Sequence, residues 1–387
     1  MEKTPFAFGK IVSTHAFTNR EKEAEKLTRN LLGGIHTMLI SPRRWGKSSL
    51  VEKVILDINK EEKGCKTVIL DLFRASNEKA FLEIFAQEVI KASSPKWQEW
   101  VAGGSAFFKK LVPRLSFGAD PSADFSLSFD WQDLKKNSDE VLHLPETIAQ
   151  KKKVKFIVCL DEFQNLAAFP EFIAFEKKLR ACWQCHKNVS YCLYGSKRHM
   201  MVDIFNNPSK PFYRFGDVML LGKIETQKWV SFICKGFERT GKYIAEDVAV
   251  QIPRIMKNHS WYVQQLAHYT WTLTRRKATL AALDAALNEL LRTNSPHYQA
   301  QAENINQTQL GLLKAVAKGM TQLTGADVMT EYSLGTPRNV SKNKTILFNR
   351  DMIDENNGKY EFADPAFEIW FKMQYFNQPY NKLMVND

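Results

Sequence analysis

Short apolar runs alternate with segments of helical periodicity along the first 222 residues. Four of these runs have the length and apolar content of buried strands, at 37–40, 66–72, 154–160 and 189–195. Helical spacing occupies 49–56 and 81–92, and a polar helix is expected from Glu21 to Leu32, capped by Thr18 or Asn19. Strands separated by helices predict an α/β fold with a doubly wound parallel sheet and right-handed crossovers.

The pattern changes in three regions. Turn residues followed by alternation at 117–129 predict a hairpin, so residues 102–140 are interpreted as an insertion in the α/β core. Residues 225–293 are all-helical in pattern, and Ser295-Pro296 is expected to break the chain. Three helices and an Asn-Gly hairpin at 351–362 then predict a winged helix-turn-helix. The expected domains are therefore 1–222, 223–300 and 301–387.

Composition excludes some classes and leaves others open. The 387 residues, 44% of them hydrophobic, suffice for two or three globular domains, and no apolar run has the length of a membrane helix. Residues 1–5 lack a signal-peptide layout, so we expect a cytoplasmic protein without a membrane partner. A net charge of +12 suits nucleic acid or nucleotide phosphate, but equally a lysine-rich solvated surface. Cys182, Cys185 and His186 match a haem-attachment spacing, which we interpret as chance.

The strongest chemical signal follows the first strand. Ser41-Pro42-Arg43-Arg44-Trp45-Gly46-Lys47-Ser48 ends as a phosphate-binding loop does, between a predicted strand and a predicted helix that continues from Ser49. Lys47 would neutralise the β- and γ-phosphates, and the Ser48 hydroxyl would reach Mg²⁺. Ser41 stands where the pattern has glycine, which makes the turn less free. A basic loop of chance composition is the alternative interpretation.

A second signal ends the third apolar strand. Asp161 would hold the water shell of Mg²⁺, and Glu162 would polarise the attacking water as general base. The carboxyl ends of parallel strands are where such sheets bind ligands, although acidic residues there can also be merely solvated. Two motifs in this order together predict a site for ATP and Mg²⁺.

The chain resembles the archaeal-type ATPases, a STAND branch of the AAA+ proteins, and the segments that carry this resemblance are 17–21, 41–50 and 160–164. The resemblance covers nearly the whole chain apart from 102–140. It implies that Asn19 and Arg20 lie near the adenine, that Ser196 is a polar sensor, and that Arg214 is an arginine finger. It also makes 223–300 a helical lid, although 258–266 lacks the glycine and proline of the family's lid signature. Helix capping and surface charge remain the alternatives for Asn19 and Arg20, as an ordinary turn does for Ser196 and a surface arginine for Arg214.

These motifs predict an ATP-binding and ATP-hydrolysing molecular switch, with ADP as product. The nucleotide contacts expected are Asn19, Arg20 and 41–49, the metal ligands are Ser48 and Asp161, and the catalytic residues are Lys47, Glu162, Ser196 and Arg214. One alternative is a nucleotide-dependent regulatory protein that binds DNA through polar residues of the third winged-domain helix, and another is a nucleotide-bound scaffold without turnover. A protein partner or homo-oligomer is also compatible, and Arg214 could act in its own chain or on a neighbour.

Overall fold

The computed structural model describes residues 4–9, 20–93, 138–356 and 358–378. The chain divides into two units, 13–222 and a second made of 1–12 with 223–387, and each is described by itself. Asn19 lies outside the described residues, as does most of the expected insertion with its hairpin at 117–129. Within the described chain, no helix has the length and apolar character needed to cross a membrane.

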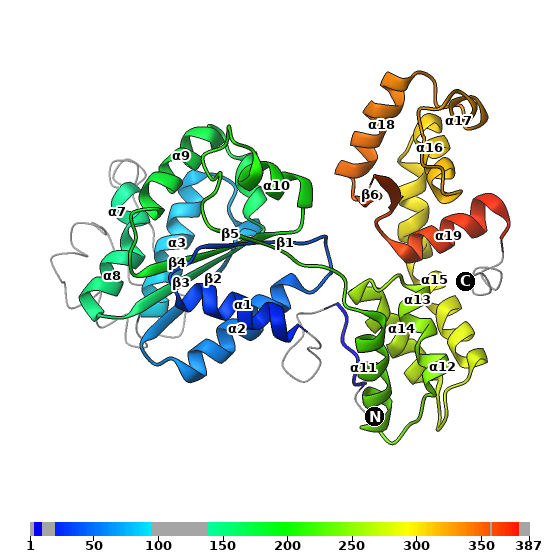
Figure 1. The fold of residues 1–387 in the computed structure, drawn as a ribbon, viewed down its shortest axis with the longest axis horizontal. Helices are drawn as coiled ribbons and strands as arrows, with labels where there is room; N and C mark the ends of the chain where they lie inside the picture. Colours follow the sequence, from blue (N-terminus) through cyan, green and yellow to red (C-terminus); the bar gives the residue numbers. More distant parts are fainter. Residues whose placement is uncertain (1–3, 10–19, 94–137, 357, 379–387) are drawn as a thin grey trace, which may run out of the picture. The chain divides into compact units, whose positions relative to one another are not determined.

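A five-stranded parallel sheet forms the centre of the first unit (Figure 1). Its order is β2-β3-β4-β1-β5, with β1 between β4 and β5, and every pairing is parallel, so crossover connections must join the strands. This confirms the predicted α/β fold. The strands are β1 (Thr37–Ile40), β2 (Cys65–Asp71), β3 (Lys155–Asp161), β4 (Val189–Gly195) and β5 (Asp217–Leu220).

Helices cover both faces of this sheet, and each face has its own apolar cluster. Along β3, Phe156 and Val158 point into one cluster while Ile157 and Cys159 point into the other, which is why this strand is almost wholly apolar. One face packs against α1 (Glu21–Leu32) and α2 (Lys47–Glu61). The other packs against α3 (Glu78–Ser93), α7 (Ser138–Leu142), α8 (Leu144–Lys152), α9 (Phe172–Trp183) and α10 (Arg198–Asn206).

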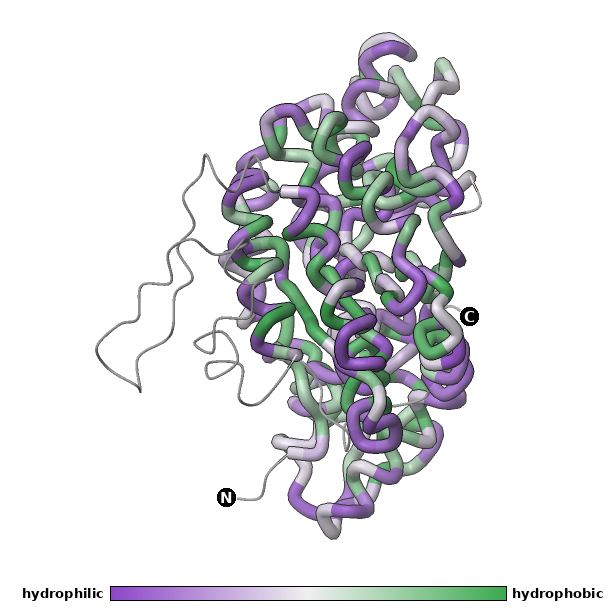
Figure 2. Tube along the Cα trace, turned by 90° about the vertical axis from the view of Figure 1, so that its left-hand side faces the viewer, coloured by the Kyte–Doolittle hydropathy of each residue, from purple (hydrophilic) through white to green (hydrophobic). Residues whose placement is uncertain are grey.

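The second unit is built mainly of helices around one continuous apolar cluster. Hydrophobic and hydrophilic residues alternate around the helices of the molecule, as amphipathic packing requires (Figure 2). The first part of the second unit consists of α11 (Thr226–Glu238), α12 (Glu246–Ala249), α13 (Gln251–Ile255), α14 (Ser260–Leu273) and α15 (Leu280–Glu303). Its second part consists of α16 (Gln307–Ala317), α17 (Ala326–Glu331), α18 (Pro337–Asn349), β6 (Ile353–Asn356), β7 (Lys359–Phe362) and α19 (Pro365–Phe376).

The chain break expected at Ser295-Pro296 is wrong. Pro296 lies inside α15, which continues to Glu303, so the boundary expected at residue 300 falls within a helix. A proline removes one backbone hydrogen bond from a helix. Packing around the site offsets this loss, because Tyr298 is fully buried and the Trp370 indole donates a hydrogen bond to Ser295 Oγ at 3.0 Å.

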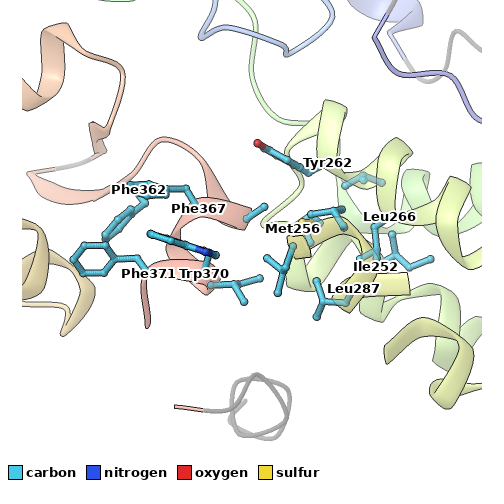
Figure 3. Packing of buried hydrophobic residues seen from close by; sticks show 14 of the residues in the cluster. Ile252, Met256, Tyr262, Leu266, Leu287, Phe362, Phe367, Trp370 and Phe371 are labelled. Atoms are coloured by element: carbon cyan, nitrogen blue, oxygen red, sulfur yellow. The ribbon is translucent and has the colours of Figure 1, made fainter. Parts of the chain in front are cut away.

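Aromatic residues at the end of the hairpin and after it complete this cluster (Figure 3). Phe362, Phe367 and Trp370 gather on one side of it, and Met256 and Leu287 extend it into the preceding helices. The predicted helices and hairpin of the winged segment are therefore present and are joined to α13–α15 by shared packing.

The N-terminal segment packs with the second unit rather than with the sheet. Phe6 is buried against Phe232 and Phe237, and a Cβ at Gly236 would lie 2.8 Å from the Phe6 ring. The Ala7 amide also donates to Gln264 Oε1 at 2.9 Å. The domain expected at 1–222 thus differs from the structure in its first residues, since a short apolar segment gives no sign of where it will pack.

Candidate nucleotide site

The loop expected to bind phosphate joins β1 to α2, as predicted. Arg44 and Gly46 have left-handed backbone, with φ of 66° and 90°, whereas Ser41 does not. The serine at the first pattern position therefore meets no conformational penalty, and the concern about its freedom to turn is removed. Ser41 is buried, and its hydroxyl donates to the Pro42 carbonyl at 3.1 Å.

Gly46 caps α2, and the backbone N–H groups of Lys47, Ser48 and Ser49 open that helix. The first N–H groups of a helix have no intrahelical acceptors, and they carry the positive end of the helix dipole. Such an end binds anionic oxygens readily. Of the remaining loop residues, Pro42 and Trp45 are half-buried, whereas Arg43 and Arg44 are exposed.

The two predicted motifs meet at one edge of the sheet. Ser48 Oγ donates to Asp161 Oδ2 at 2.9 Å. Lys47 Nζ lies 3.9 Å from Asp161 Oδ1 and 3.7 Å from Glu162 Oε1, and its side chain is only 7% exposed. A cation, a hydroxyl and two carboxylates thus converge where the phosphate loop ends, as the sequence motifs predict.

The two carboxylates differ in electrostatic environment. Burial raises the pKa of Asp161, an effect that Lys47 and the Ser48 hydroxyl oppose without cancelling. Burial also acts to raise the pKa of Glu162, but Lys47 together with hydrogen bonds from Gln164 and Ser196 lowers it overall. The structure therefore holds Glu162 as a carboxylate, which is the form a general base needs.

Ser196, the predicted sensor, contacts this site. It follows β4 directly, and its hydroxyl and backbone N–H both donate to Glu162 Oε2, at 2.8 and 3.3 Å. Gln164 Nε2 donates to the same carboxylate oxygen. Sequence reasoning assigned Gln164 no role, because only the fold brings this side chain back onto Glu162.

Arg20, at the start of α1, forms a hydrogen bond to the backbone of the phosphate loop. Its side chain is 3% exposed, and its guanidinium pairs with Glu23 at 2.9 Å and donates to the Trp45 carbonyl at 3.3 Å. Burial lowers the pKa of Arg20, against the opposing influence of Glu23. Arg20 is therefore not the surface charge of the alternative interpretation.

Arg214 is not brought into this group. In the parallel pairing of β1 and β5, Thr37 lies opposite Asp217 and Ile40 lies opposite Leu220. The phosphate loop follows Ile40, whereas Arg214 precedes Asp217, so the two lie beyond opposite ends of the sheet. Arg214 is exposed, has left-handed backbone, and places its guanidinium 5.2 Å from the Tyr213 ring.

Comparisons with known proteins agree with this architecture. A model described as a probable winged helix domain matches residues 296–373, and no curated protein matches the chain by sequence. A Walker-type ATPase of Pyrococcus abyssi is similar in structure, with a TM-score of 0.65 at 17% identity over 92% of this chain and 96% of that one. The ORC2 protein of Aeropyrum pernix, solved in ADPNP–ADP complexes, has a TM-score of 0.53 at 13% identity over 92% and 94%. The chain thus shares the fold of this Walker-type ATPase and of the ORC2 protein, with a winged helix domain in residues 296–373.

Proposed function

We propose that this chain binds ATP with Mg²⁺, hydrolyses it, and uses the cycle as a molecular switch of the STAND type. The observation that carries the proposal is the meeting of Lys47 and Ser48 with Asp161 and Glu162 at the end of the phosphate loop. Each of these four groups has a distinct task in phosphoryl transfer, and a merely solvated edge would not bury Lys47 against both carboxylates.

The residues present fit Mg²⁺. A hydroxyl and a carboxylate are the oxygen ligands this ion takes, and two neighbouring ligands at its usual bond length lie about 3 Å apart. Ser48 Oγ and Asp161 Oδ2 are 2.9 Å apart. A bound Mg²⁺ would neutralise charge on the phosphate oxygens, while Ser48 and Asp161 would hold it or its water shell.

Lys47 and Glu162 have the two remaining roles, which are phosphate binding and proton transfer. Lys47 would exchange its carboxylate partners for the β- and γ-phosphates, which frees Glu162 Oε1 to accept a proton from the attacking water. The Ser196 hydroxyl holds the other carboxylate oxygen during this exchange.

Nucleotide binding is tested with Lys47→Ala and a matched control. Lys60→Ala removes an exposed lysine from the same helix, far from the loop. Affinity for a fluorescent ATP analogue with Mg²⁺ should fall at least about tenfold in Lys47→Ala, since a buried cation on the phosphates is lost, and should stay at the wild-type value in Lys60→Ala. Equal affinity in all three proteins would overturn the assignment of this loop.

We further propose that Arg214 serves a neighbouring copy of the chain as an arginine finger. Its exposure and its position beyond the opposite end of the sheet support action between copies rather than within one. Mixing Lys47→Ala, which keeps Arg214, with Arg214→Ala, which keeps its own phosphate site, should restore turnover that neither variant has alone. A mixture no more active than its components would contradict this role.

The charge of the winged helix domain supports a role in protein contact rather than in DNA binding. Residues 296–373 hold eight Lys and Arg against nine Asp and Glu, and the hairpin itself carries Asp354, Glu355 and Glu361. Phosphate binding needs a basic surface. On α18, Asn343 is buried against Gln309, and the exposed cations are Arg338 and Lys342. Salt-sensitive binding of a DNA duplex that is lost in Arg338→Ala with Lys342→Ala would instead favour the DNA-binding alternative.

A further inference from the structure

Gln164 is the least explained polar group at the site. It lies in the short helix η2 (Phe163–Ala168), directly after the two carboxylates, and is 2% exposed. Its Nε2 donates to Glu162 Oε2, but its Oε1 is buried and has no hydrogen-bond partner among the described residues. A buried amide oxygen without a partner costs folding free energy, and an apolar side chain would avoid that cost. A glutamine at this position therefore points to a role other than stability.

The surroundings fix this side chain in place. Gly195 lies against it so closely that a Cβ at that position would fall 1.8 Å from Gln164 Oε1. Phe163, fully buried, packs its ring 5.7 Å from Phe205 and 5.4 Å from Phe212. Glu162 itself has left-handed backbone, with φ of 53°, a conformation that non-glycine residues keep only where the surrounding structure holds it.

The two oxygens of Glu162 have different neighbours. Oε2 accepts three hydrogen bonds, from Gln164 Nε2, Ser196 N and Ser196 Oγ, which saturate an oxygen with about two lone-pair sites. Oε1 faces only Lys47 among these groups, at 3.7 Å. When Lys47 turns to phosphate, Oε1 is the oxygen left to accept a proton.

We propose that Gln164 is a positioning residue, which locks the rotation of the Glu162 carboxylate so that Oε1 and not Oε2 faces the attacking water. The inference rests on the proposed ATPase function and deepens it. In this role Gln164 acts only through Glu162, to which its Nε2 donates, and it needs no contact of its own with nucleotide or water. A base held in one orientation transfers a proton more efficiently than one that rotates, and small misplacements of catalytic groups can cost about a hundredfold in rate.

Gln164→Met tests this, because methionine has a similar length and volume but cannot donate. We expect kcat for ATP to fall about 10- to 100-fold, with KM and the affinity for a fluorescent ATP analogue within about twofold of wild type. Tm should stay near the wild-type value, since the lost hydrogen bond is offset by removal of the unpartnered oxygen. A structural role predicts instead that Tm and kcat fall together. Gln164→Leu serves as a second variant should the first fold poorly.

The matched control is Gln265→Met in α14. Gln265 is 4% exposed, and its Oε1 also has no hydrogen-bond partner among the described residues, but it lies in the other unit. This variant should keep the wild-type kcat. A loss of kcat as large as that of Gln164→Met would show that removing any buried amide slows turnover, and would overturn the inference.

Epistasis with Glu162 separates the inference from the function on which it rests. If wild type releases no phosphate from ATP, or Glu162→Gln turns over at the wild-type rate, the proposed function fails. If both behave as expected, Gln164→Met should lower single-turnover rates in the wild-type background but not in the Glu162→Gln background. An equal further loss in both backgrounds, or an unchanged kcat in Gln164→Met, would refute the positioning role alone.

Discussion

Glu176, in α9, is a fully buried carboxyl group outside the nucleotide site. Neither of its oxygens has a hydrogen bond of good geometry among the described residues, although the nearby Phe212 backbone N–H acts to lower its pKa. The charged groups that act on it are Lys210 and Asp203, which pair with each other at 3.5 Å. Burial raises the pKa of Glu176 to about 7, a rise that Lys210 opposes and Asp203 increases.

This shift makes stability depend on pH with a definite sign. The carboxyl has a pKa of 4.5 in the unfolded chain and about 7 in the folded one, so between these values the folded state binds more protons. Stability is therefore highest below pH 4.5 as far as this group is concerned, and it falls as pH rises through 7. Each pKa unit corresponds to about 1.4 kcal/mol, so the full effect is on the order of 3 kcal/mol.

Glu176→Gln keeps the volume and removes the titration. From pH 5 to pH 8 the free energy of unfolding of wild type, relative to this variant, should fall by about 2.5 kcal/mol, since part of the effect is already lost at pH 5. Urea unfolding followed by tryptophan fluorescence measures this difference. Glu171→Gln, which alters an exposed carboxylate just before α9, should change stability by less than about 0.5 kcal/mol at either pH. Parallel pH profiles for wild type and Glu176→Gln would refute the reasoning.

Three further substitutions test other parts of the account. Gly195→Ala should lower kcat for ATP at least about tenfold, because a methyl group 1.8 Å from Gln164 Oε1 must displace that side chain; steady-state phosphate release measures it, and an unchanged kcat would contradict the tight contact. Phe6→Ala should lower the urea stability of the helical unit by about 3–5 kcal/mol, as expected for a buried aromatic residue, whereas a cost below about 1 kcal/mol would show that the N-terminal segment does not pack there. Asn343→Ala should lower stability by about 1–3 kcal/mol, because Gln309 loses its buried acceptor at 3.1 Å, and a fully stable variant would argue that Asn343 faces solvent.

The parts of the fold that sequence reasoning predicted well are those dominated by burial. The strand expected at 154–160 is found at Lys155–Asp161, since a parallel strand covered on both faces must be apolar at nearly every position. The fifth strand, Asp217–Leu220, was missed because it is short and lies at the sheet edge, where Leu220 is 62% exposed. The chain break predicted at Pro296 is wrong because local propensity yields to tertiary packing in α15.

At the site, too, the sequence predicts some residues and not others. Lys47, Ser48, Asp161 and Glu162 belong to motifs whose order and flanking strands fix where they meet. Gln164 belongs to no motif with a known mechanical reason, and its contact with Glu162 depends on the left-handed turn at that residue. Such a contact is a property of backbone geometry, which residue patterns do not encode.

The central claim is that the carboxylate of Glu162, beside Lys47, activates water for ATP hydrolysis. Steady-state phosphate release from Mg²⁺–ATP by wild type and Glu162→Gln, measured beside the affinity of each for a fluorescent ATP analogue, tests it most directly. We predict turnover by wild type, a loss of roughly 10²- to 10⁴-fold in the variant as for removal of a general base, and equal affinities. Turnover at the wild-type rate in Glu162→Gln, or none in wild type, would contradict the claim.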